Sequence, residues 1–238
     1  MTEVGEGLAA VWARVWAASP APGPLDLVGA VVVVAALLLP QATWRRLRHG
    51  ITIVHEAGHG FAATLTRRRL AGIRLHSDTS GLTVSVGRPR GPGMVLTLVA
   101  GYPAPSAAGV LVTWAVATGH AALALWGALV LLLLVLVQIR NWFGLWSVLV
   151  AGAVVGAVTW FADPAWRMRA ALALALLLVL GGLRAALELP RTRGADGGSD
   201  ADQLARITPV PVAVWLLLFV LLPLAALGGA GWLLVAPL

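Results

Sequence analysis

The chain contains no cysteine and no lysine. Without cysteine it has no disulfides and no thiolate metal sites, so any metal ion must be held by histidine and carboxylate side chains. All 17 basic residues are arginine, which we attribute to genomic composition, and charged residues make up only 11% of the sequence. The net charge of +7 does not indicate nucleic-acid binding, because the arginines lie at the ends of apolar segments, as in membrane proteins.

Most of the chain consists of apolar residues. Of the 238 residues, 59% are hydrophobic, and the mean hydropathy is +0.88. A soluble domain of this length does not need so much apolar surface, so the chain is predicted to be an integral membrane protein with several spans. The N-terminal residues lack a short apolar segment with a cleavage site, and we expect no cleaved signal peptide.

The distribution of apolar segments predicts an all-α polytopic membrane protein with about seven transmembrane helices, forming a single domain over residues 1–238. We expect it in a bacterial cell membrane. Residues 1–23 predict an interfacial segment, and residues 188–207 a polar loop. Two prolines and several small residues in the third apolar segment predict a broken helix or close helix packing there. The expected spans are residues 25–40, 51–66, 93–118, 121–137, 142–161, 170–187 and a last one that follows Pro211 and ends at about residue 232.

Residues 70–92 have a different pattern, in which apolar side chains alternate with polar ones on both sides of a polar centre at residues 77–81. This alternation predicts a β-hairpin. An extended substrate could add a strand to its edge, although an ordinary connecting hairpin fits the pattern equally well. Strict alternation of seven spans places 12 arginines on the side of the hairpin and five on the other. It also places Asn141 and the segment around Asp200 on the side of the hairpin.

The segment His55-Glu56-Ala57-Gly58-His59 brings three ionisable side chains into an apolar stretch. Residues four apart lie on one face of a helix, so His55 and His59 can bind one metal ion. Glu56 is offset by one residue and can act as general base on a metal-bound water molecule. The pattern also occurs by chance in soluble helices. Its apolar setting favours a metal site, because ionisable groups within a membrane are costly.

A catalytic zinc site usually has three protein ligands, so a third is needed. Asp200 and Asp202 are weakly favoured, because they begin a helix-like stretch just before the last apolar segment. Asn141 is a candidate hydrogen-bonding residue near the site, or a cap of the following helix. The carboxylates that remain after the motif are Asp78, Asp163, Glu188, Asp196, Asp200 and Asp202.

In this order, the motif, the hairpin, Ala100-Gly101-Tyr102-Pro103 and Ser199-Asp200-Ala201 resemble the site-2 protease-like intramembrane zinc metallopeptidases, in particular their compact bacterial B-type branch. The resemblance covers about residues 51–215. The usual N-x-x-P-x-x-x-L-D-G motif of that family is reduced to its start at Asn141-Trp142-Phe143-Gly144, which has no aspartate.

The resemblance implies that His55 and His59 bind Zn²⁺, that Glu56 activates the water, and that Asp200 is the third ligand, with Asp202 as the alternative. The expected function is hydrolysis of peptide bonds in membrane-embedded proteins or peptides. We expect the protein to lie in the lipid bilayer and to bind no nucleic acid. The sequence does not indicate its oligomeric state. Two alternatives are a catalytically silent membrane scaffold and a metal-binding or transport protein.

Overall fold

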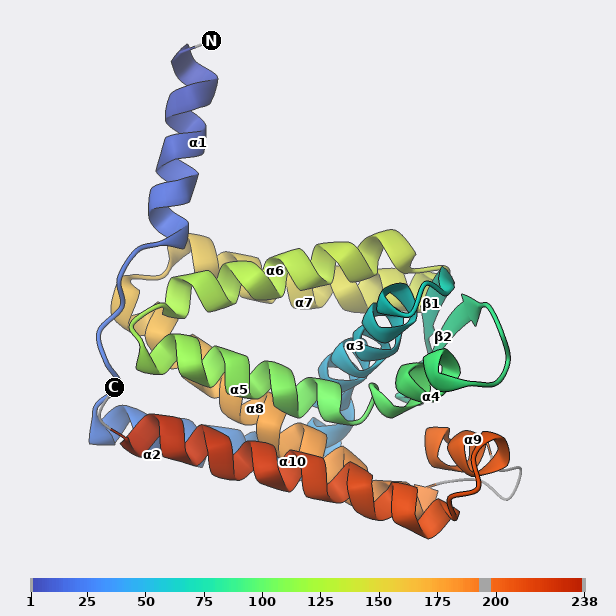
Figure 1. Ribbon diagram of the computed structural model, residues 1–238. Coiled ribbons are helices and arrows are strands. Elements are labelled where there is room, and N and C mark those ends of the chain that lie inside the picture. The colour runs from blue at the N-terminus through green and yellow to red at the C-terminus, as the bar shows by residue number, and fades with distance from the viewer. Residues whose placement is uncertain (1, 193–197, 237–238) are drawn as a thin grey trace.

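The computed structural model describes residues 2–192 and 198–236, and it has the expected helical architecture with one small sheet (Figure 1). The elements in chain order are α1 (Thr2–Val15), α2 (Pro24–Leu38), α3 (Gln41–Leu65), β1 (Arg69–Leu75), β2 (Gly81–Val86), α4 (Pro92–Val99), α5 (Pro103–Ala117), α6 (Ala121–Gln138), α7 (Trp142–Phe161), α8 (Pro164–Thr192), α9 (Asp200–Ile207) and α10 (Val212–Val235).

The number of candidate membrane spans among the described residues is four to six. Helices α6, α7, α8 and α10 are each long and apolar enough to cross a membrane, and two bent helix pairs raise the number to six. One pair is α4 with α5, bent by 63°, which confirms the broken helix expected there. The other is α2 with α3, bent by 104°. The sequence predicts about seven spans because it treats the apolar parts of α2 and α3 as separate crossings.

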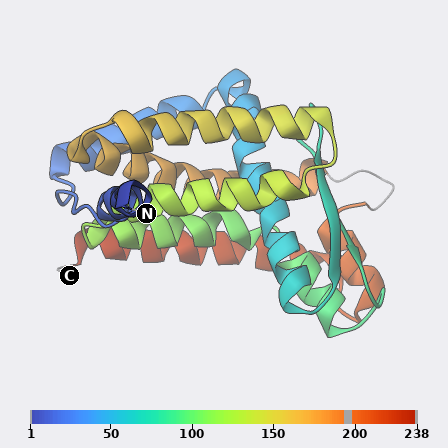
Figure 2. The same cartoon turned by 90° about the horizontal axis from the view of Figure 1, so that it is seen from above.

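The helix that carries the motif crosses the end of the bundle. Figures 1 and 2 show α5 to α8 and α10 side by side, with α3 running steeply across them near one end. Helix α8 is the most buried of the long helices and packs against α2, α5, α6 and α10. Residues 41–50, which lie between two of the expected spans, form the first part of α3, which begins directly after Pro40. That proline has extended backbone and suits a helix start.

A polar network from α8 fixes the bend between α2 and α3. The Arg184 guanidinium donates to the carbonyl of Leu38 and to Oε1 of Gln41, the latter at 2.7 Å. Glu188 Oε2 accepts from the Trp44 indole at 3.0 Å and from Arg48 at 3.1 Å. Because these partly buried groups satisfy one another, the start of α3 is held in a defined place.

The expected β-hairpin is confirmed, and its two edges differ. Strands β1 and β2 are antiparallel, with Ile73 opposite Thr83 and Leu75 opposite Gly81. On the outer edge of β1, the backbone of Leu75 bonds the Asn141 side chain in both directions, and the Ile73 carbonyl accepts from the Arg140 amide. In an antiparallel pair, opposed residues that do not bond each other point their backbone groups outward. Gly81 and Thr83 therefore direct theirs to the outer edge of β2, which no described strand covers.

The arginines are concentrated at the end of the bundle where α3, the hairpin, α4 and α9 lie (Figure 1). Of the sixteen arginines on described residues, only Arg14, Arg167 and Arg169 belong to elements at the opposite end. Strict alternation of spans divides the arginines into 12 on the side of the hairpin and five on the other side. The structure changes this division, because the bend between α2 and α3 brings the arginines of α3 to the side of the hairpin. The positive-inside rule predicts that the end with α3 faces the cytoplasm.

Candidate metal centre

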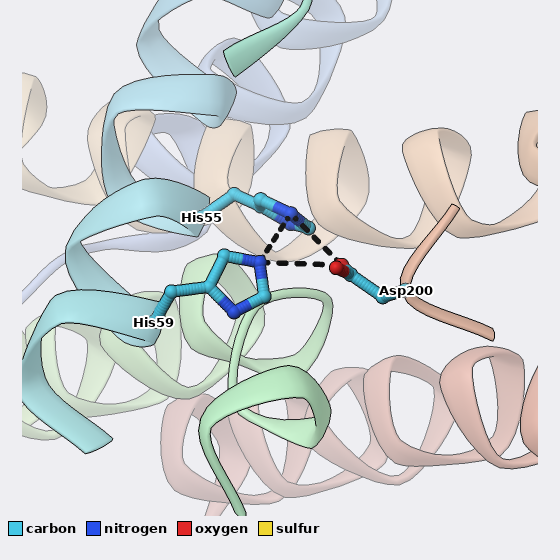
Figure 3. A group of neighbouring side chains, drawn as sticks. All are labelled: His55, His59 and Asp200. Atoms are coloured by element: carbon cyan, nitrogen blue, oxygen red, sulfur yellow. Dashed lines mark hydrogen bonds and ion pairs between the residues drawn. The ribbon is translucent and has the colours of Figure 1, made fainter. Parts of the chain in front are cut away.

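His55 and His59 lie one turn apart on α3, and their rings meet edge to face. The two Nε2 atoms are 3.0 Å apart, and the ring centroids are separated by 4.6 Å. Asp200, the first residue of α9, reaches them from the other side (Figure 3). Its Oδ2 lies 3.3 Å from His55 Nε2 and 3.2 Å from His59 Nε2. Three potential ligand atoms from two distant segments of the chain therefore converge on one point.

The donor set fits a metal ion. Ligands at bond lengths of about 2.0–2.1 Å in a tetrahedral zinc site lie roughly 3.3 Å from one another. The triangle formed here has edges of 3.0 to 3.3 Å. A proton bridges only two of these atoms at a time, whereas a metal ion among them can accept the lone pairs of all three. The site can thus hold a metal ion with two histidines and one carboxylate.

The tautomer of His59 is set by a carbonyl group. His59 Nδ1 lies 2.7 Å from the Thr97 carbonyl oxygen, which can only accept, so Nδ1 carries the proton. A neutral ring then directs the lone pair of Nε2 toward His55 and Asp200. Thr97 lies in the last turn of α4, where carbonyl groups have no partner within the helix. Such a contact orients a metal-binding imidazole.

Glycines allow the close approach of α3 to the break between α4 and α5. A Cβ atom on Gly101 would lie 2.4 Å from the His59 ring and 2.7 Å from that of His55. A Cβ atom on Gly58 would lie 2.7 Å from the carbonyl oxygen of Ala100. Gly58 is therefore a point of close backbone approach, and the imidazoles fit only because residue 101 has no side chain.

Glu56 is buried between α3 and β2, with only 3% of its surface exposed. Its Oε2 accepts a hydrogen bond from the Thr83 hydroxyl at 2.6 Å, while no described residue bonds its Oε1. Gly81, two residues before Thr83 and on the same face of the strand, leaves room for the carboxyl group. The hairpin thus supports the side chain that the sequence predicts to be the base.

A cavity of about 540 Å³ joins these groups. Its lining includes both histidines, Glu56, Asp200 and residues 81–85 of β2. Tyr102 also lines it, with its ring edge-on to His55 and stacked on Phe219 at 4.8 Å. The outer edge of β2 and the three metal-binding candidates therefore face the same space.

The other sequence-predicted residues lie outside this group. Asp202 bonds the hydroxyl of Ser199, which caps α9 in return. Asn141 bonds Leu75 and makes no side-chain cap for α7, so it holds the hairpin rather than the metal-binding candidates. Asp196 lies outside the described residues. Among the described residues, the metal-binding group does not include Asp78, Asp163, Glu188, His49, His76 or His120.

Sequence reasoning missed Thr83 and Thr97. Thr83 could have been found from the strand alternation, which puts it on the same face as Gly81. Thr97 acts through its backbone carbonyl, so its side chain gives no signal.

A family model described as Peptidase M50B-like matches residues 28–230 of the chain. No curated protein and no solved structure matches the chain. The matched segment includes α3, the hairpin and α9, and therefore all the residues that converge on the cavity. The chain belongs to the Peptidase M50B-like family.

Proposed function

We propose that the protein is an intramembrane zinc metalloprotease that hydrolyses peptide bonds of membrane-embedded substrates. The observation that carries this proposal is the convergence of His55, His59 and Asp200 beside the buried Glu56. The peptidase family and the four to six candidate spans supply the reaction class and the membrane setting. Zinc is the metal of choice because two imidazoles and a carboxylate, with one position left for water, are typical of its catalytic sites.

Zinc bound at these three residues supplies Lewis-acid chemistry, which activates water and polarises the peptide carbonyl. Glu56 takes the proton of the attacking water and passes it to the leaving amine. The Thr83 hydroxyl holds Oε2, so Oε1 is the oxygen that receives the proton. Burial of the carboxyl group limits competing water and keeps the base in one orientation.

The outer edge of β2 is the proposed substrate-binding element. A transmembrane helix has its backbone groups paired internally, so it must unwind before a peptide bond can be attacked. The outward backbone groups of Gly81 and Thr83 can pair with an unwound segment as an added strand. Because Gly81 and Thr83 also contact Glu56, a strand bound there lies next to the base.

The metal assignment predicts about one zinc ion per chain in detergent-purified protein. We expect His59→Ala and Asp200→Ala to lose zinc, because each removes one of three ligands, while Asp202→Ala retains it. Zinc content measured by plasma mass spectrometry, with the fold checked by circular dichroism, tests all three variants.

Wild-type protein that stays free of zinc after supplementation would favour the silent scaffold. Loss of zinc in Asp202→Ala, with retention in Asp200→Ala, would exchange the roles of the two aspartates. Metal flux in proteoliposomes would instead support a transporter.

Strand addition predicts a period of two in the substrate. A membrane-embedded peptide that the wild type cleaves is selected from a library and N-methylated at one backbone nitrogen at a time. Alternate positions near the cleaved bond should lower kcat/KM by about fivefold to tenfold, because every second N–H points to β2. The intervening positions serve as the matched controls. Equal effects at consecutive positions would argue against strand pairing.

A further inference from the structure

A second cavity, of about 640 Å³, lies between the first half of α3 and the turn of the hairpin. Helix α3 contributes Arg45, Arg46, Arg48 and His49, and the hairpin contributes residues 77–79. This basic cavity does not include the metal-binding candidates, although Arg48 and Thr79 line both spaces. The function proposed above makes no use of its cationic residues.

Two of the arginines are available to a ligand. Arg45 and Arg46 are exposed, and neither forms a hydrogen bond or an ion pair with a described residue. Arg48, in contrast, is paired with Glu188 at 3.1 Å. Asp78 is the one carboxylate in the lining, and its Oδ1 is engaged by the amide and hydroxyl of Ser80 at 2.9 and 2.7 Å. Neighbouring guanidinium groups without partners are suited to the oxygens of a phosphate group.

The neighbours of the basic cavity place it at the level of the lipid headgroups, which indicates that the phosphate belongs to a lipid. The His49 ring lies 5.2 Å from that of Phe143, at the start of α7. The adjacent Trp142 and Trp146 are 85% and 67% exposed. Exposed tryptophans at the end of a transmembrane helix mark the level of the lipid headgroups. The positive-inside rule also predicts that the arginine-rich end faces the cytoplasm, where the leaflet carries anionic lipids.

We propose that the basic cavity binds the headgroup phosphate of an anionic phospholipid, which bridges α3 and the hairpin turn. On the α3 side, Arg45 and Arg46 provide the charge. On the other side, the Thr79 carbonyl accepts a hydrogen bond from the Thr52 hydroxyl at 2.9 Å. The turn leads directly into Gly81 and Thr83, so the bound lipid steadies the strand that supports Glu56. Binding itself does not depend on proteolysis.

The test uses full-length protein in a neutral detergent with added phosphatidylglycerol. Native mass spectrometry counts the retained lipid, and thermal unfolding measures the shift in Tm. We expect the wild type to bind phosphatidylglycerol and gain thermal stability. The double variant Arg45→Gln/Arg46→Gln should bind it about 25-fold more weakly, from roughly fivefold for each arginine. The matched control Arg88→Gln/Arg90→Gln removes the same charge from exposed residues outside the basic cavity and should bind like the wild type.

Three outcomes would overturn the proposal. Equal retention of phosphatidylcholine would show that headgroup charge is irrelevant. Equal stabilisation by inorganic phosphate at the same concentration would show that the occupant is a free anion. Equal weakening in both double variants would show that total surface charge, and not this cavity, attracts the lipid. The two mutated residues are exposed and glutamine is a good helix former, so the fold should persist.

Discussion

The variant Glu56→Gln should bind zinc like the wild type and yet cleave substrate about 10²- to 10⁴-fold more slowly. Glutamine has the shape of glutamate, and its carbonyl oxygen can accept the same hydrogen bond from Thr83. The amide cannot take a proton from water, so the base is removed while the metal-binding residues are untouched. Single-turnover cleavage of a membrane-embedded reporter peptide, measured together with zinc content, gives both quantities.

Asp202→Asn is the matched control, since it makes the same change from carboxylate to carboxamide outside the metal-binding group. It should keep both zinc and activity. Full proteolysis by zinc-loaded Glu56→Gln would overturn the assignment of the base. Loss of zinc in that variant would instead indicate that Glu56 contributes to metal binding.

Features encoded by nearby residues were predictable from the sequence. The spacing of His55 and His59 needs only the helical period, and the hairpin needs only the alternation of apolar residues over residues 70–92. Asp200 is different, because its closeness to α3 depends on how α8 and α9 pack. In the sequence, Asp200 was favoured only by a weak helix start and by a family resemblance. The structure brings Asp200, rather than Asp202, to the two histidines.

The direction of α3 was not predictable from composition. Its apolar second half has the character of a span, but the 104° bend after α2 turns it across the bundle. That bend depends on contacts from Arg184 and Glu188, which are remote in the sequence. Hydropathy reports which residues avoid water, and it does not report the angle between consecutive helices. The same limit explains why strict alternation of spans separates the arginines of α3 from the hairpin, whereas in the structure they lie beside its turn.

Gly81→Ala should slow cleavage by about 100-fold while zinc content stays unchanged. A Cβ atom at this position would lie 2.3 Å from Oε1 and 2.6 Å from Cγ of Glu56, closer than atoms can approach. Either the carboxyl group or the strand must therefore move. A displacement of about 1 Å in a catalytic group can cost on the order of 10²-fold in rate. Since none of the three metal-binding candidates is displaced, we expect the loss to appear in kcat.

Gly87→Ala provides the matched control, because it adds the same methyl group just after the end of β2. There the nearest neighbours are atoms of the Arg68 side chain at 3.2 to 3.3 Å, and a flexible arginine can yield. Its activity should stay within about twofold of the wild type. If Gly81→Ala raised KM without lowering kcat, the hairpin would serve substrate binding alone. Unchanged kinetics would mean that the position of Glu56 is not set by β2. They would also argue against the proposed role of Thr83 in holding the Glu56 carboxyl group.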